Sequence, residues 1–392
     1  MTLTSAPAAE FGTRPRHLGG QALPLYVSLE TSAAQLRRGD RRLATLERLE
    51  RFDLYPRVTL PLLRSPYLRL TPTFGFRLTQ YGGRLTQAAT VPGCPADGRT
   101  GLRVLDCPLR RVTAEASLDL RLPALTRIYD HPQHRTKHVL ESQVVYRYVD
   151  GVRRFDEIFR FDETDLLTDT REVEYSLTNR IFRKERAKPG QVEEFLSWRL
   201  AQKYFFDPDL GGVLRTAERN VVAALTSLTG FAWASGPRRF SPLVSTFKIT
   251  PGRQYDTEWR LDYDLAQHQL VNSRLTVSAL LWREFRASLA HFVTRNDPLL
   301  QPRSQQLRFL LSYGQMNRRG LNVAFGASWN IQQDVFQNST AQATYNWDCC
   351  GIAFEFRRLG LGQLRSENQY RFAFSIANLG TFGTLRRQER LF

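Results

Sequence analysis

The chain has 392 residues, a formal net charge of +17 and a mean hydropathy of −0.38. No run approaches the roughly 18 consecutive apolar residues of a membrane-spanning helix, which excludes a helical membrane protein. The positive charge is almost entirely arginine, and although a basic chain can bind nucleic acid, no zinc-finger spacing, RNP motif or basic helix is present. We therefore expect no nucleic-acid partner.

The chain begins with a segment, residues 1–21, that lacks the basic start and apolar run of a secretory signal peptide. We expect this segment to be disordered, followed by one β domain over residues 22–380 and a tail over residues 381–392. An exported barrel needs a signal peptide. The sequence therefore predicts either the later part of a longer chain or a protein that is not exported.

Apolar and polar residues alternate with a period of two, the pattern of a sheet with one apolar and one wet face. Many of these segments run about ten residues or more, enough to cross a bilayer at a tilt, whereas strands of a soluble sandwich are shorter. The pattern predicts an all-β fold, a transmembrane antiparallel β-barrel with roughly sixteen strands in this chain. Clear examples are residues 68–78, 172–181, 260–264, 322–331, 344–348, 352–357 and 370–377.

The connections between these segments alternate between short and long. Outer-membrane barrels have short periplasmic turns and long outer loops, so this alternation predicts which connections face the periplasm. A short helix is expected in the longest loop, at residues 214–228. The expected short connections are residues 64–66, 130–134, 188–190, 251–253, 317–320 and 349–350, and the long ones are about 83–108, 152–167, 208–239, 296–303 and 359–366.

The four cysteines fall in two places. Cys94 and Cys107 lie in a loop-like stretch where a local disulfide is expected, although four cysteines allow three pairings and the sequence does not choose among them. Cys349 and Cys350 are adjacent in a predicted turn, where one peptide unit cannot easily supply disulfide geometry. If both are oxidised, they reach two distant segments, and the alternative is a pair of free thiols.

Two clusters contain metal-ligating residue types. The histidines of the first have basic neighbours, which argue against a metal. The carboxylates of the second lie in a predicted outer loop, where a solvated loop is favoured over a calcium or magnesium site. Because GxSxG, P-loop and HExxH motifs are also absent, we predict no enzyme activity, metal or cofactor. The clusters are His131, His134 and His138, and Asp162, Glu163 and Asp165.

Several stretches of the chain together resemble one known family. The stretch YNWDCCGIAFEFRRLGLG (345–362), followed by ENQYRFAFSIANLGTFG (367–383), resembles the C-terminal end of the lipopolysaccharide-assembly protein family LptD. The cysteine pair and the NLG-x-FG ending are its most specific features. Other stretches that resemble the family's barrel are residues 51–62, 137–149, 172–182 and 310–322, so the resemblance covers nearly the whole chain from about Pro24.

The resemblance implies an outer-membrane barrel of roughly twenty-six strands that inserts lipopolysaccharide into the outer leaflet. It implies an LptE-like lipoprotein plug and an LptA-like periplasmic bridge that docks through an N-terminal jelly roll. This chain lacks the jelly roll and the first third or so of the barrel, so we expect a part of a longer LptD-like protein.

Two site predictions follow from the resemblance. In the family the lateral opening lies between the first and last strands, which places Tyr370, Phe372, Phe374 and Ile376 on one lip of a lateral gate. The family's adjacent cysteines pair with cysteines near and within the N-terminal domain. We therefore expect Cys349 and Cys350 to bond to cysteines outside residues 1–392, while Cys94 and Cys107 bridge each other.

The sequence leaves three candidate functions open. The first is the barrel of a lipopolysaccharide translocon, integral to the outer membrane. The second is a generic porin or receptor barrel, or a truncated gene product without function. The third is a soluble basic β protein that binds nucleic acid. Contacts with lipopolysaccharide and an LptE-like lipoprotein separate the first from the second, and detergent dependence separates both from the third.

Overall fold

The computed structural model describes most of the chain as β-strands. None of the described residues belongs to a helix with the length and apolar character needed to cross a membrane. All 23 named elements of secondary structure are strands. The described residues are 2–20, 24–39, 49–65, 67–86, 90–95, 103–152, 154, 157–158, 164–165, 167–186, 191–208, 238–252, 254–282, 284–295, 304–314, 319–360, 366–376 and 380–383.

The chain forms two compact units. The first contains residues 1–124, 141–177 and 201–241, and the second contains residues 125–140, 178–200 and 242–392. Three strands contribute residues to both: β11 (His134–Asp150), β12 (Thr170–Glu185) and β13 (Val192–Phe205).

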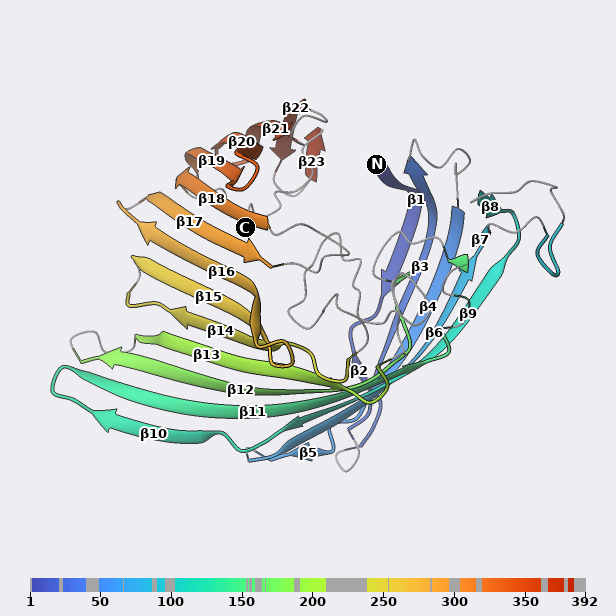
Figure 1. The fold of residues 1–392 in the computed structure, drawn as a ribbon, viewed down its shortest axis with the longest axis horizontal. Helices are drawn as coiled ribbons and strands as arrows, with labels where there is room; N and C mark the ends of the chain where they lie inside the picture. Colours follow the sequence, from blue (N-terminus) through green and yellow to red (C-terminus); the bar gives the residue numbers. More distant parts are fainter. Residues whose placement is uncertain are drawn as a thin grey trace. The chain divides into compact units, whose positions relative to one another are not determined.

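In the first unit, the long strands follow the order β1–β3–β4–β6–β9–β11, and every pair is antiparallel (Figure 1). Leucine, arginine and threonine are the commonest residues of these strands, and their threonine, valine, tyrosine and phenylalanine residues suit a pleated surface. Strands β7 and β8 form a separate pair. The strands of this unit are β1 (Thr2–Gly12), β2 (Arg16–His17), β3 (Tyr26–Gly39), β4 (Leu49–Thr59), β5 (Leu63–Arg64), β6 (Arg69–Tyr81), β7 (Arg84–Thr86), β8 (Arg103–Leu105) and β9 (Leu109–Arg121).

In the second unit, strands β14 to β23 pair with their sequence neighbours as consecutive antiparallel hairpins (Figure 1). β10 (Leu125–Asp130) pairs with the beginning of β11. The others are β14 (Leu243–Ile249), β15 (Tyr255–Asp264), β16 (Gln269–Leu280), β17 (Phe285–Thr294), β18 (Ser304–Tyr313), β19 (Gly320–Asn330), β20 (Val335–Asn346), β21 (Cys350–Gly360), β22 (Ser366–Ile376) and β23 (Gly380–Gly383).

The prediction of an all-β antiparallel fold is confirmed, but the strands outnumber the roughly sixteen expected. Among the described residues, 21 strands belong to one hydrogen-bonded sheet. Part of the difference lies in residues 1–21, expected to be disordered, where β1 pairs with β3 from Thr2↔Gly39 to Gly12↔Glu30. Another part is β23, because residues 381–383 of this strand belong to the segment expected to be a C-terminal tail.

Further strands were missed because two tight turns lack the usual turn residues. Residues 265–268 join β15 to β16 without glycine or proline, which are the strongest turn signals in a sequence. The carboxylate of Asp264 accepts hydrogen bonds from the backbone N–H groups of Ala266 and Gln267, at 2.9 and 3.1 Å. His268 then adopts a φ of 51°, a conformation that is several-fold enriched in histidine, asparagine and aspartate among non-glycine residues.

The turn between β19 and β20 has the same construction. Asn330 Oδ1 accepts hydrogen bonds from the backbone N–H groups of Gln332 and Gln333, at 3.0 and 3.2 Å, and Asp334 has a φ of 51°. An Asp or Asn that ends a strand and a His or Asp four residues later is the sequence signal that both turns share.

In the second unit, connections alternate between two edges of the sheet, because β14 to β23 are consecutive antiparallel pairs. The strand pairs β14–β15, β18–β19 and β20–β21, which carry expected short connections, turn at one edge, and β21–β22, which carries an expected long one, turns at the other. The two tight turns at residues 265–268 and 331–334 lie at the same edge as the β21–β22 connection. The helix expected at 214–228 and the connections at 188–190 and 296–303 lie outside the described residues.

Candidate functional site

The strands expose their apolar residues and bury their polar ones. On β21, Ile352 and Phe354 are 51% and 48% exposed, whereas Ala353 and Glu355 are 9% and 5% exposed. A sheet in water would bury its aromatic residues instead. A sheet with an outward apolar face and a polar interior fits a bilayer, as in outer-membrane barrels. We refer to the two sides as the apolar face and the polar face.

In the first unit, the polar face of β4, β6 and β9 carries a network of charges and hydroxyl groups. Thr79 donates to Asp53 Oδ1 at 2.6 Å, and Tyr55 donates to Glu115 Oε2 at 2.9 Å. The Arg77 guanidinium lies 4.0 Å from the Tyr55 ring centroid, and its Nε is 3.9 Å from both Asp53 and Glu115. The network neutralises charge locally and keeps this face hydrophilic.

A residue from the connection between β11 and β12 is buried against this face. The Asp165 side chain is 0% exposed, and its carboxylate accepts hydrogen bonds from Arg51 Nη1 at 2.9 Å and from Tyr81 Oη at 2.8 Å. Arg111 Nη2 donates to the carbonyl oxygen of the preceding Thr164 at 2.6 Å. We call this group of contacts the Asp165 anchor.

The Asp165 anchor corrects the interpretation of the acidic cluster. A solvated outer loop was expected for Asp162, Glu163 and Asp165, but Asp165 is fully buried and ion-paired. Its carboxylate oxygens bond to Arg51 and Tyr81, and a cation ligand is not needed to satisfy them. Asp162 and Glu163 lie outside the described residues.

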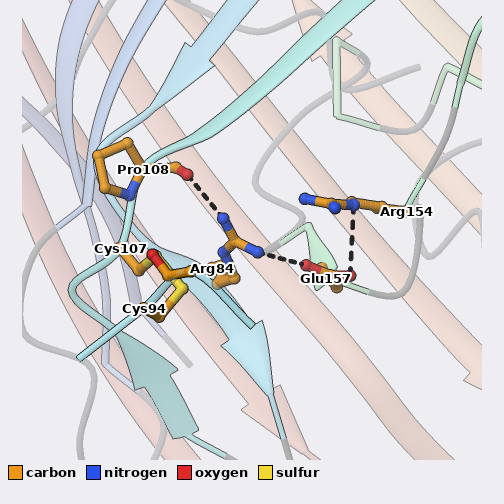
Figure 2. The surroundings of a disulfide bond; sticks show 7 residues. Arg84, Cys94, Cys107, Pro108, Arg154 and Glu157 are labelled. Atoms are coloured by element: carbon orange, nitrogen blue, oxygen red, sulfur yellow. Dashed lines mark hydrogen bonds and ion pairs between the residues drawn. A yellow bond between two sulfur atoms is a disulfide. The ribbon is translucent and has the colours of Figure 1, made fainter. Parts of the chain in front are cut away.

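A second set of contacts joins the loop after β6 to the same connection (Figure 2). The structure contains the disulfide between Cys94 and Cys107, with Cα atoms 5.7 Å apart. Beside it, Arg84 donates to the carbonyl oxygen of Pro108 at 2.9 Å and forms a 3.2 Å ion pair with Glu157. The disulfide loop and the β11–β12 connection are thus tied to each other within the first unit.

A small apolar cluster packs beneath these contacts. Leu49, Tyr81, Leu109 and Ile158 are each at most 3% exposed. Ile158 comes from the β11–β12 connection and the other three come from strand ends, so burial of Ile158 reinforces the Asp165 anchor. The sequence did not reveal this packing, because no local periodicity marks an isolated isoleucine in a loop.

Cys349 lies in the turn between β20 and β21, and Cys350 is the first residue of β21. The Trp347 N–H donates to the Cys350 carbonyl oxygen at 2.9 Å, which closes the turn. Both cysteines are thiols in the structure, and Cys349 is exposed. An exposed cysteine at a turn is accessible to a disulfide partner on another segment.

Non-reducing peptide mapping of the protein from its native host should give a linked Cys94–Cys107 peptide. The family resemblance further implies that Cys349 and Cys350 are each linked to a different cysteine outside residues 1–392, and adjacent cysteines are poor partners for each other. A peptide that joins Cys94 or Cys107 to Cys349 or Cys350 would contradict this prediction.

The four residues assigned to the lateral gate lie on one face of β22. Tyr370, Phe372 and Phe374 are 66%, 63% and 37% exposed, whereas Ala373 is 5% exposed and packs against Ala353 on β21. Ile376 ends the strand. All four therefore belong to the apolar face. β22 is not the last strand, however, because β23 pairs with it from Ala373↔Gly383 to Ile376↔Gly380.

The three histidines do not converge. The rings of His131 and His134 stack with centroids 4.6 Å apart, but His138 Nε2 is hydrogen-bonded to Asn179 Oδ1 at 3.3 Å. Among the described residues, no group of three potential ligands is placed to hold a metal ion.

The sidedness of the chain can be tested at two described turns. A Cβ at Gly252 would meet no atom within 4 Å, and Gln267 is exposed, so both positions accept cysteine. In a background with Cys349→Ser and Cys350→Ser, a membrane-impermeant maleimide should label Gln267→Cys on intact cells. Gly252→Cys should be labelled only after the outer membrane is permeabilised. The opposite result would reverse the assigned sidedness.

Comparisons with known proteins connect these features to one family. The family model of LptD, LPS transport system D, matches residues 19–334, more than half of the chain. No curated protein sequence is significantly similar to the chain.

Three solved structures illustrate the structural similarity. The siderophore receptor PirA from Acinetobacter baumannii has 8% identity and a TM-score of 0.43, covering 94% of this chain and 63% of PirA. The FrpB iron transporter from Neisseria meningitidis has 11% identity and a TM-score of 0.42, covering 95% of this chain and 64% of that one. The ferric-catecholate import receptor Fiu from E. coli K12 has 11% identity and a TM-score of 0.33, covering 94% of this chain and 73% of Fiu.

These similarities are too low to support an inference about function, and the chain spans less than two thirds of the length of PirA. The family match is of a different kind, because it rests on sequence and covers strands of both units. The chain therefore belongs to the LptD family of the LPS transport system.

Proposed function

We propose that this chain is an integral outer-membrane barrel segment that transports lipopolysaccharide to the outer leaflet. The observation that carries the proposal is the match to the LptD family over residues 19–334. The inverted exposure of the strands supports it, because an amphipathic lipid needs a polar path for its sugars and phosphates beside an apolar surface for its acyl chains. The role requires no covalent chemistry.

The edge of β22 supports the proposed lateral gate. β22 pairs with β21 along its whole length, from Cys350↔Ile376 to Gly360↔Ser366. Its other edge pairs with β23 over residues 373–376 alone within the described part of the chain. Four residue pairs hold less than the full β21–β22 ladder does, so this edge of β22 opens at lower cost than its edge with β21.

Two protein partners belong to the proposal. An LptE-like lipoprotein would occupy the barrel against its polar face, and an LptA-like periplasmic protein would deliver lipid through an N-terminal domain. Both are expected to co-purify with the protein from detergent-solubilised outer membranes.

Depletion of the protein in its native host tests the function. Lipopolysaccharide on the surface of intact cells, measured with a membrane-impermeant antibody, should fall and should recover when the wild-type gene is restored. Unchanged surface lipopolysaccharide, together with reduced uptake of a small solute, would instead support a porin or receptor barrel.

A further inference from the structure

Among the described residues, the polar face of the second unit contains two arginines without a carboxylate within ion-pair distance. Most arginines on this face are neutralised by a nearby carboxylate, at 3.4 to 3.8 Å. Among the described residues, neither Arg274 nor Arg308 lies within ion-pair distance of a carboxylate. Both guanidinium groups instead lie against the Phe292 ring, with Cζ atoms 5.1 and 4.5 Å from its centroid. The neutralised arginines are Arg260, Arg286, Arg357 and Arg371.

Strand register explains why these three side chains meet. Arg274 on β16 is directly opposite Phe292 on β17, and Arg308 on β18 is opposite Ala290, two residues before Phe292. All three therefore point to the same side of the sheet. Two cations on one ring repel each other, so the arrangement favours an anion between or beside them.

A cavity of about 230 Å³ opens next to Arg308. It lies at a β-bulge, where the register between β19 and β20 shifts so that Ser328 pairs with Asn338 while Trp329 pairs with Phe336. The extra residue is Gln337. Bulges of this kind re-aim side chains and often lie next to binding sites. The cavity is lined by Arg308, Gly326, Ala327, Ser328, Gln337, Asn338 and Thr340.

The lining supplies donors for an anion and for hydroxyl groups. Arg308 Nη2 donates to Gln306 Oε1 at 3.1 Å, which orients the guanidinium, while its buried Nε has no hydrogen-bond partner in the described part of the chain. Thr340 donates to Asn338 Oδ1 at 3.3 Å and so orders that amide. A buried N–H without a partner is costly, and an anionic ligand would satisfy it.

We propose that Arg308, Arg274 and the bulge cavity form a binding site for a phosphorylated sugar. The guanidinium groups would bind the phosphate, for which arginine is well suited. Ser328, Gln337 and Asn338 would bind sugar hydroxyls in the cavity. The proposal rests on the proposed function. It names a site that would bind the head group of the lipid during transport.

Equilibrium dialysis of the full-length protein in phosphate-free detergent micelles tests the site. The probes are N-acetylglucosamine 1-phosphate, N-acetylglucosamine and inorganic phosphate. The sugar phosphate should bind most tightly, and Arg308→Gln should weaken it about tenfold or more, as expected for loss of a charge-assisted hydrogen bond. Arg286→Gln is the matched control, because Arg286 lies on the same face but is paired with Asp256 at 3.4 Å, and it should change binding less than twofold.

A second variant tests the cavity without removing charge. A Cβ at Gly326 would lie 3.5 Å from Leu310 Cδ1, an ordinary contact, so Gly326→Leu fits the backbone while its side chain fills the cavity. It should weaken the sugar phosphate but not inorganic phosphate. Equal binding of the sugar phosphate and inorganic phosphate by the wild type would overturn the sugar site, as would equal losses in Arg308→Gln and Arg286→Gln.

The result is independent of the transport assay. If the wild type binds the sugar phosphate through Arg308 but depletion leaves surface lipopolysaccharide unchanged, the site stands and the proposed function fails. If depletion lowers surface lipopolysaccharide but the wild type does not bind the sugar phosphate, the proposed function stands and the site fails.

Discussion

Asp165→Ala is expected to lower the free energy of unfolding by about 3–5 kcal/mol, the usual cost of removing one partner of a buried ion pair. The Asp165 side chain is 0% exposed and that of Arg51 is 7% exposed, so the substitution removes one member of a buried ion pair. The hydroxyl of Tyr81 also loses its acceptor. The change should release the β11–β12 connection from the polar face.

Urea unfolding of the protein in lipid vesicles, followed by tryptophan fluorescence, measures this effect. Asp130→Ala is the matched control, because Asp130 and Arg135 form an exposed ion pair, 55% and 57% exposed, and such pairs contribute less than about 1 kcal/mol. The double variant Arg51→Met with Asp165→Leu should recover most of the loss, since it removes both charges. A loss in Asp165→Ala no larger than in Asp130→Ala would show that the connection is not anchored here.

Phe372→Arg is expected to destabilise the assembled barrel by about 2–4 kcal/mol, the cost of an arginine that faces lipid near the bilayer midplane. Phe372 is 63% exposed near the middle of β22, on the apolar face that the proposed function places against lipid. The arginine would also weaken the strand at the edge that pairs with β23. The amount of assembled protein should fall because the assembled barrel is less stable.

The assembled fraction can be measured in outer membranes by the shift in gel mobility between unheated and heated samples. Phe372→Leu is the control, since it keeps an apolar side chain at the same position and should leave the assembled fraction nearly unchanged. If Phe372→Arg assembles as well as Phe372→Leu, the side chain does not face lipid.

The strands could be predicted because their signal is local. In residues 68–78, the exposed side chains of Phe74 and Phe76 alternate with polar neighbours, and a period of two depends on nothing beyond the segment itself. The same holds for β22, whose four gate residues share one face. The turn at Cys349 and Cys350 could also be predicted from the local sequence, because the alternating apolar residues occupy odd positions before it and even positions after it.

The rest could not be predicted, because it depends on contacts between distant residues or on turns without the usual residues. Asp165 and Arg51 form an ion pair although they are 114 positions apart in the sequence, and no pattern in the sequence near either residue predicts this contact. The turn at residues 265–268 contains neither glycine nor proline. The bulge at Gln337 likewise becomes visible only once β19 and β20 are in register.

The alternation of exposed and buried residues has a consequence for how the protein reaches its destination. In the unfolded chain, Phe354 is flanked by Ala353 and Glu355, and the chain as a whole has a mean hydropathy of −0.38. No linear stretch of it is apolar enough to be retained by a bilayer as a helix. A continuous apolar surface exists only after the strands have paired. Folding and partition into lipid are therefore one coupled reaction, and the chain acquires its affinity for a membrane at the place where it folds.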